Sequence, residues 1–202
     1  GVNTSDKINL NRIESIRMGT TVATNALLEK KGEKIAFITT KGLKDLQYIG
    51  NQSRPKIFDL IISKSELLYT NDNVYEIDER VKYDSSNQIY QSTKLPNEND
   101  IKNILEDIKS KGIKSLAIAL LNSYAFPEHE LMIEKIAKSM NFLNQISLSS
   151  QLMPVMKLVP RGCTTCVDAY LTPIIKTYLK SFSQHFYGES NELQEKTSFM
   201  QS

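Results

Sequence analysis

Two strand-helix-strand patterns constrain the fold of this chain more than any other feature of its sequence. In the first, residues 13–18 read as a strand, and residues 20–30 have the apolar spacing of a helix that ends at Gly32. The next strand, residues 34–39 (KIAFIT), has few polar breaks, which is typical of a strand covered on both faces.

The second pattern lies in the middle of the chain. Asn97 and the acidic residues after it favour the start of a helix, and the apolar strand 115–121 (SLAIALL) follows that helix. A second helix begins near Pro127, and the strand 145–150 (QISLSS) completes the pattern. Such alternation predicts an α/β fold with a mainly parallel sheet and covering helices.

The remaining segments are less regular. Residues 74–90 predict an exposed strand followed by a hairpin-like turn. Residues 160–162 (PRG) read as a turn before a long helical pattern that is interrupted at Pro173. A polar loop is expected at 187–196, and a further strand begins at 197–202.

The change of texture after Ser150 predicts two parts, an α/β domain at 1–150 and the start of another domain at 151–202. The chain begins at Gly1 without an initiator Met and stops within an apolar run at Ser202. We therefore expect a piece of a longer polypeptide.

Composition excludes some classes of protein. The net charge of +2 gives no general attraction to nucleic acid or to an anionic membrane, and no apolar run approaches the length of a membrane helix. The first twenty residues lack the zones of a signal peptide, so a cytosolic setting is expected. Cys163 and Cys166 lack the further ligands of a zinc site and the context of a redox motif, which predicts two reduced, structural thiols and no metal site.

Gly19, Thr20 and Thr21 lie between the first strand and its helix. Free amide groups at a helix start and two hydroxyl groups can bind an anion, although a simple helix cap by Thr20 explains the same residues. Asn25, one turn later, is an amide inside a helix and can face a ligand or water. Residues 39–42 (TTKG) repeat this arrangement with a lysine but do not form a Walker-type loop.

Two arginines beside turn-forming residues, Arg54 and Arg161, are candidates to grip a carboxylate or a phosphate. The alternative is a structural ion pair, for which Asp59, Asp78 and Asp168 are available.

His129 lies between Glu128 and Glu130 in the segment PEHE. It is a candidate general base, but local packing in the first turn of a helix explains it as well. No residue is identified as catalytic from the pattern alone.

Five ordered segments together resemble the hydantoinase A/5-oxoprolinase family over almost the whole chain. The segment VPRGCTTCVDAYLTP within them is similar to the oxoprolinase branch of that family rather than to bacterial hydantoinase A subunits. The five segments are 17–60 (RMGTTVATNALLEKK and onward), 75–81 (YEIDERV), 120–130 (LLNSYAFPEHE), 147–179 (SLSSQLMPV and onward) and 199–202 (FMQS).

The resemblance implies a hydrolase that opens the lactam of 5-oxo-L-proline to L-glutamate at the expense of ATP, a step of glutathione metabolism. Mg²⁺ is expected with the ATP. Activation of the carbonyl oxygen by phosphorylation makes chemical sense, because a planar, resonance-stabilised lactam resists hydrolysis. The alternatives are a hydantoinase A type ATPase acting on another cyclic amide, and a noncatalytic α/β interaction module.

The resemblance also implies a hydantoinase/oxoprolinase N-terminal domain followed by the start of an actin-like ATPase domain. The two glycine-containing phosphate hairpins of such a domain would lie before Gly1 and after Ser202, so this chain alone is expected to be inactive. Its partners would be 5-oxo-L-proline and the remainder of the same polypeptide, and a homodimer is an open alternative. The resemblance places five residues as candidates to line the substrate or nucleotide cleft, with Arg161 as a clamp for the substrate carboxylate: Gly19, Thr20, Thr21, Asn25 and Arg161.

Overall fold

The computed structural model describes residues 8–51, 53, 58–61, 66–187 and 190–200. It divides the chain into two compact units, a larger one at 33–170 and a smaller one formed by 1–32 and 171–202. These units do not follow the boundary expected near residue 150, which stays a prediction.

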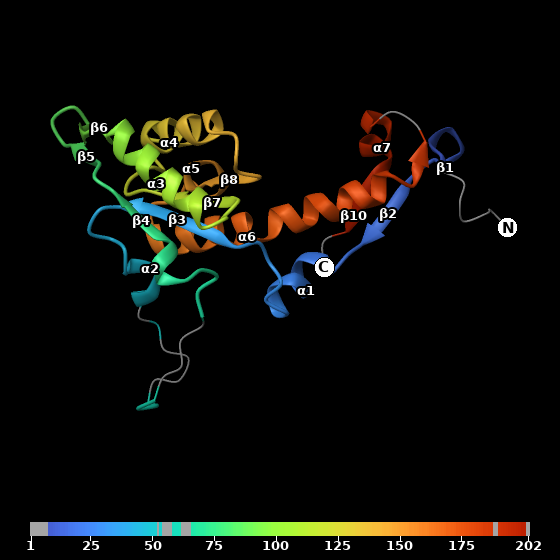
Figure 1. The fold of residues 1–202 in the computed structure, drawn as a ribbon, viewed down its shortest axis with the longest axis horizontal. Helices are drawn as coiled ribbons and strands as arrows, with labels where there is room; N and C mark the ends of the chain where they lie inside the picture. The colour runs from blue at the N-terminus through green and yellow to red at the C-terminus, as the bar shows by residue number, and fades with distance from the viewer. Residues whose placement is uncertain (1–7, 52, 54–57, 62–65, 188–189, 201–202) are drawn as a thin grey trace. The chain divides into compact units, whose positions relative to one another are not determined.

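The larger unit is built on a four-stranded, wholly parallel sheet with the strand order β4-β3-β7-β8 (Figure 1). Both buried strands that the apolar runs predict lie at its centre, where Ile35 pairs with Ser115 and Thr39 pairs with Ala119. The α/β fold with a mainly parallel sheet is therefore confirmed. The four strands are β3 (Ile35–Thr40), β4 (Val74–Ile77), β7 (Ser115–Ala119) and β8 (Gln145–Leu148).

Helices α3 (Glu98–Ser110) and α4 (Glu128–Ser139) contribute to the core on one face of this sheet. The side chain of Asn97 caps α3 by accepting a hydrogen bond from the amide of Asn99, as the sequence predicts. Alternate residues of β3, Ala36 and Ile38, belong to the core that the two helices complete. The rest of this core is fully buried and almost entirely aliphatic: Ile77, Ile101, Leu105, Ile108, Ile113, Leu116, Ile118, Leu120, Ile133, Ala137 and Leu148.

Residues 74–84 form two strands in different sheets rather than one exposed strand. The first, β4, joins the central sheet, and the chain then passes through Asp78 and Glu79 into β5 (Arg80–Asp84). Strand β5 pairs with β6 (Ile89–Lys94) in an antiparallel hairpin, so the predicted turn is confirmed. Three short helices connect the other elements: α2 (Leu46–Ile49), η2 (Asn71–Asn73) and α5 (Ser149–Leu152).

Helix α6 (Leu158–Ser183) corrects two expectations, because the predicted turn at 160–162 lies in its first turns and the helix continues through Pro173. A proline near a helix start breaks no bond, since the first amides have no partner within the helix. Pro173 removes the bond to the carbonyl of Ala169, and this carbonyl instead accepts a hydrogen bond from the hydroxyl of Ser115.

Gly162 brings the start of α6 into close contact with the central sheet. A Cβ atom at this position would overlap the amide of Gln47 and lie 3.5 Å from the ring of Phe37. Gln47 is buried and is held by the carbonyl of Leu158 and the thiol of Cys163.

Gly162→Ala is therefore expected to lower the free energy of unfolding of the chain by about 1–3 kcal/mol, because Gln47 must leave both partners. Urea denaturation followed by circular dichroism measures the change. Combining it with Gln47→Ala, which removes the obstructing amide, should recover part of the loss. An unchanged midpoint for Gly162→Ala would contradict the close contact.

The smaller unit contains two parallel strand pairs, β1 (Ile8–Asn9) with β9 (Phe186–Tyr187) and β2 (Ile16–Gly19) with β10 (Thr197–Met200). The predicted strand after the polar segment is confirmed as β10. Its helices, besides the second half of α6, are η1 (Leu10–Arg12), α1 (Val22–Leu28) and α7 (Ser190–Lys196).

The loop predicted at 187–196 is wrong, because α7 occupies most of it. An ion pair one turn apart stabilises this helix, with Lys196 Nζ 2.7 Å from Glu192 Oε1. The same ammonium group donates to the carbonyl of Leu10, which lies at the other end of the sequence. This long-range contact is invisible to local pattern reading. Within the described residues, no helix has both the length and the apolar character to cross a membrane.

Candidate functional site

Buried polar side chains gather where the strands of the central sheet end. The carboxyl ends of parallel strands meet at one edge of a sheet, which is where α/β folds place their ligand sites. Each strand of the sheet contributes to this edge, together with the start of α4 and the first turn of α6. The buried polar members are Thr39, Thr40, Glu79, Ser123, His129, Glu130, Ser149 and Arg161.

Arg161 lies at the centre of this set with no exposed surface. Its Nη1 donates to the hydroxyl groups of Ser123 and, at 2.8 Å, of Ser149, while Nη2 donates to the carbonyl of Leu120 at 2.9 Å. The nearest carboxylate oxygen, of Glu130, lies 4.0 Å from Nη1. Burial lowers the pKa of the Arg161 guanidinium, and the charge of Glu130 counteracts part of that effect.

Glu130 is equally buried and takes most of its hydrogen bonds from the same groups. Its Oε1 accepts from the hydroxyl of Ser149 at 2.6 Å, from Ser123 at 2.7 Å and from the amide of Leu120 at 3.0 Å. Its Oε2 accepts from the amide of Ser150 at 2.9 Å. Two opposite charges thus share two serines, and the cluster joins the ends of β7 and β8 to α4 and α6.

The clamp role predicted for Arg161 stays a prediction, and full burial favours the structural alternative. The partner is Glu130 rather than any of the aspartates that the sequence offered. Asp168 accepts from Ser147, and Asp78 lies 2.7 Å from the ammonium of Lys94. The other candidate arginine, Arg54, lies outside the described residues.

A second buried chain links the hairpin to α4. His129 Nδ1 lies 2.6 Å from Glu79 Oε2, and His129 Nε2 lies 2.8 Å from the hydroxyl of Ser92. Glu79 also accepts a hydrogen bond from the hydroxyl of Thr40. The order serine, histidine, carboxylate is that of an activated serine nucleophile. The imidazole of His129 is 2% exposed and packs edge-on against Phe126. In this buried position, the chain of hydrogen bonds fixes the β5–β6 hairpin to the sheet edge.

The sequence placed His129 between two neighbouring glutamates, but its partner is Glu79, which lies in the short connection between β4 and β5. Reasoning from the sequence missed Glu79, Ser123 and Ser149. One signal was available, because each of the three lies in the few residues after a strand of the parallel sheet, where the carboxyl edge collects polar groups.

The loop at 39–42 holds an anion that belongs to the protein itself. The amides of Gly42 and Lys44 donate to Glu76 Oε1 at 2.7 and 3.1 Å. The ammonium of Lys41 lies 3.3 Å from Asp78 Oδ2. Hydrogen bonds from Lys94 and Lys41 lower the pKa of that aspartate. Lys41 thus meets a carboxylate of the protein itself, while its side chain remains 63% exposed.

The other four candidates lie together in the smaller unit, at the junction of β2 and α1. Gly19, Thr20, Thr21 and Asn25 are all exposed. Thr20 Oγ1 accepts from the amide of Val22 at 3.3 Å, and Asn25 Nδ2 donates to Thr21 Oγ1 at 3.2 Å. The N-cap of α1 is Thr21, whose side chain makes no capping hydrogen bond, so the simple cap predicted at Thr20 is wrong by one residue. Thr20 lies just before the cap and accepts a local bond from the amide of Val22. The cleft-lining role of the four residues stays a prediction.

Cys163 and Cys166 are both free thiols, the first exposed and the second buried. Burial raises the pKa of both groups, and it raises that of Cys166 well above its ordinary value. Both thiolates are therefore disfavoured, so neither residue has the character of a nucleophile.

We expect Cys163 to react with a disulfide reagent at about pH 8 more slowly than a free cysteine, and Cys166 to react only after unfolding. Thiol release monitored by absorbance measures both rates. Cys163→Ser should remove the native phase while leaving the phase seen in denaturant. A native reaction of Cys166 as fast as that of Cys163 would contradict the burial.

The described residues do not make up a nucleotide site. The loop amides at Gly42 and Lys44 are engaged with Glu76, and the Arg161 guanidinium is engaged with its own serines. Within the described ranges, no three His, Cys, Asp or Glu side chains are grouped so that they could hold a metal ion. These residues therefore do not by themselves fit ATP and Mg²⁺.

Comparison with known proteins decides the family. The hydantoinase/oxoprolinase N-terminal region family matches residues 2–141, which is more than half of the chain. The chain belongs to this family. Within this hydantoinase/oxoprolinase family, it is 50% identical to 5-oxoprolinase of Dictyostelium discoideum over 94% of its length, and 46% identical to 5-oxoprolinase 1 of Arabidopsis thaliana over 98%. It is 42% identical to 5-oxoprolinase of Saccharomyces cerevisiae over 96%. The chain spans only 16% of each of these relatives.

Solved structures share the fold at low sequence identity. The ATP-dependent caprolactamase from Pseudomonas jessenii matches 94% of the chain with a TM-score of 0.77 at 22% identity, and the chain covers 27% of it. Nucleotide-free acetone carboxylase matches 87% of the chain with a TM-score of 0.71 at 20% identity. The mainly parallel α/β architecture is thus shared across the two.

Proposed function

We propose that this chain is part of a 5-oxoprolinase, a cytosolic enzyme that opens the ring of 5-oxo-L-proline to L-glutamate with consumption of ATP. The observation that carries the proposal is the identity of 42–50% to 5-oxoprolinases of three organisms, which extends over at least 94% of the chain. The ATP dependence named for the caprolactamase of the same fold supports it as well.

The chemistry explains why a nucleotide is needed. Resonance makes the lactam carbonyl a weak electrophile, and transfer of a phosphoryl group from ATP to its oxygen, with release of ADP, would make the ring carbon electrophilic enough for water to add. The C–N bond would then break, the nitrogen leaving as the amine, and hydrolysis of the resulting acyl phosphate would release phosphate and L-glutamate. The groups that hold the phosphates are expected in the remainder of the polypeptide. The contribution of this chain is the α/β unit with its fixed sheet edge and the exposed junction at Gly19, Thr20, Thr21 and Asn25.

The test uses the full-length polypeptide. Glutamate release from 5-oxo-L-proline is measured together with ADP formation, with and without ATP, and the same assay is run on these 202 residues. We expect ATP-dependent glutamate release from the full-length protein and none from this chain. Turnover by this chain alone would overturn its expected inactivity, and a full-length protein without lactam-dependent ADP formation would favour a noncatalytic module.

A second candidate function is ATP-dependent opening of another cyclic amide. The likeness to the caprolactamase fold favours it, since the chain matches that structure over 94% of its length. Comparing kcat/KM for 5-oxo-L-proline, caprolactam and a hydantoin on the same preparation separates the two candidates. A preference for the larger or the ureido ring would replace the leading proposal.

Asn25 tests whether the β2–α1 junction lines the cleft. In the full-length enzyme, Asn25→Ala should raise the KM for the substrate or for ATP by about 10- to 150-fold, because a lost hydrogen bond to a charged ligand costs about 1.5–3 kcal/mol. Thr24→Ala, an exposed neighbour on the same helix, serves as the matched control. Equal kinetic constants for both variants would remove Asn25 from the cleft.

A further inference from the structure

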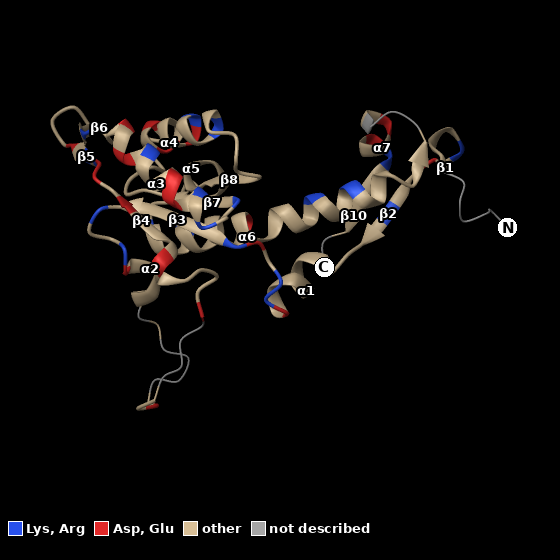
Figure 2. Cartoon of the chain, in the orientation of Figure 1, with Lys and Arg blue, Asp and Glu red and all other residues tan. Residues whose placement is uncertain are grey.

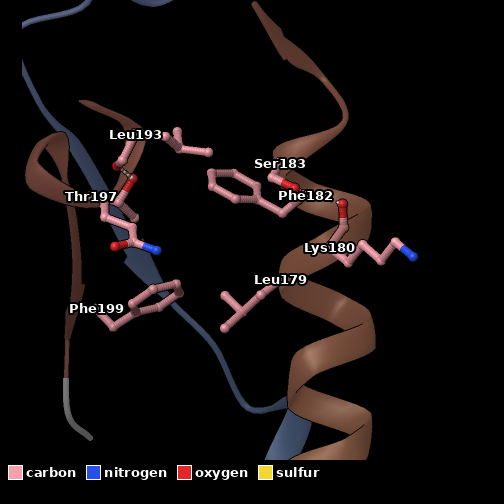
Figure 3. Close-up of a pocket in the computed structure, with 8 residues that line it drawn as sticks. Leu179, Lys180, Phe182, Ser183, Leu193, Thr197 and Phe199 are labelled. Atoms are coloured by element: carbon pink, nitrogen blue, oxygen red, sulfur yellow. Dashed lines mark hydrogen bonds between the residues drawn. The ribbon is translucent and has the colours of Figure 1, made fainter. Parts of the chain in front are cut away.

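The smaller unit carries an apolar groove that none of the groups described above uses. The second half of α6, helix α7 and strand β10 enclose a volume of about 390 Å³ (Figure 3). Leu179 and Phe182 of α6 face Leu193 and Phe199 across it. The polar lining residues are Lys180, Ser183, Gln194 and Thr197.

The strand pair beside the groove is unusually small for parallel strands. β10 pairs only with β2 within the described residues, so that Met18 lies opposite Phe199. Parallel strands occur almost always in larger sheets whose two faces are both covered. Here Phe199 is 45% exposed and Met200 is 68% exposed. Two strands with this much apolar surface on view are typical of the interior of a larger domain.

The lengths of the relatives indicate what covers this surface. The chain spans 16% of the oxoprolinases that it matches and 27% of the caprolactamase, although 94% of its own length fits the caprolactamase fold. Most of the chain of a relative is therefore available to pack against the matched part. A chain segment of the same polypeptide is held at high effective concentration, whereas a second copy is not.

We propose that the groove between α6, α7 and β10 is an internal docking surface for a segment of the same polypeptide outside residues 1–202. The segment places aliphatic or aromatic side chains between Leu179, Phe182 and Phe199 and thereby shields the β2–β10 pair. Its polar groups face the rim at Lys180 and Gln194. This inference rests on the proposed function in one respect: it takes the whole polypeptide to be as long as the 5-oxoprolinases that the chain matches.

Site-specific cross-linking in the full-length polypeptide tests the proposal. The photo-cross-linker p-benzoylphenylalanine replaces Phe199 in one preparation and Tyr83, an exposed aromatic residue of the β5–β6 hairpin, in another. After irradiation, digestion and mass spectrometry identify the joined peptides. We expect the Phe199 position to join, within one chain, to apolar peptides outside residues 1–202, at a yield about tenfold above the Tyr83 position, since cross-linking requires contact.

A second variant keeps the test decisive. Leu179→Asp, on the opposite wall of the groove, should reduce the Phe199 products about tenfold, because it puts a charge in the apolar contact. Products confined to residues 1–202, products at the mass of a dimer, or a yield equal to that at Tyr83 would each overturn the proposal. Glutamate release is measured on the same protein. A failure of the docking proposal can then be distinguished from a failure of the proposed 5-oxoprolinase function.

Discussion

Arg161→Met should lower the free energy of unfolding of the chain by about 3–5 kcal/mol, the cost of breaking a buried ion pair from one side. The substitution leaves the carboxylate of Glu130 with no exposed surface and no cation, and it removes donors from Ser123, Ser149 and Leu120. Urea denaturation followed by circular dichroism and fluorescence measures the loss.

The control is the double variant Arg161→Met with Glu130→Gln, which removes both charges. It should be more stable than the single variant, because the uncompensated charge is gone while the serine hydroxyl groups keep an amide partner. A single variant within experimental error of the unaltered protein would show that the charge is not buried in solution. It would also return Arg161 to the group of residues available to a substrate.

His129→Leu should lower the free energy of unfolding by about 3 kcal/mol, because it leaves the buried carboxylate of Glu79 with only the hydroxyl of Thr40. It also frees the hairpin, whose Ser92 loses its partner on α4. Hydrogen exchange of the β5–β6 amides, measured beside denaturant unfolding, should show faster opening of the hairpin. His185→Leu, at the exposed histidine of the smaller unit, is the matched control and should change little.

The second strand-helix-strand pattern predicted the larger unit well, because its determinants are local. The first pattern was right only for β3, because its strand and helix, β2 and α1, belong to the smaller unit, where β2 pairs with β10. β3 and β7 are unbroken apolar runs, and α3 has both its cap at Asn97 and its regular spacing within a few residues. The errors arose where distant contacts decide the structure. α7 depends on Lys196, which reaches Leu10, and α6 passes Pro173 because Ser115 takes the freed carbonyl.

The candidate site was predictable in type and only partly in detail. The residue types after each strand indicate a polar edge. Arg161 was singled out as a carboxylate clamp with a structural ion pair as the alternative; it lies fully buried at this edge, and the clamp role stays a prediction. Its partner Glu130 lay within a motif read for another purpose, the environment of His129. Acidic and basic residues occur along the whole described ribbon (Figure 2). Among the described residues, the buried ones are Glu79, Glu130 and Arg161, and the charge pattern does not distinguish these three from the rest. Which charges are buried together is decided by topology, and no local pattern records it.

The hydrogen bond from the amide of Glu33 to the carbonyl of Tyr170, at 3.0 Å, joins the first and last residues of the larger unit. Chain entry and exit are therefore adjacent, which is the geometry of an inserted domain. Helix α6 nevertheless runs unbroken through Tyr170, so the exit lies inside a helix and not in a loop. A short linker that replaced this module would therefore have to cap the remaining half of α6 at its new start.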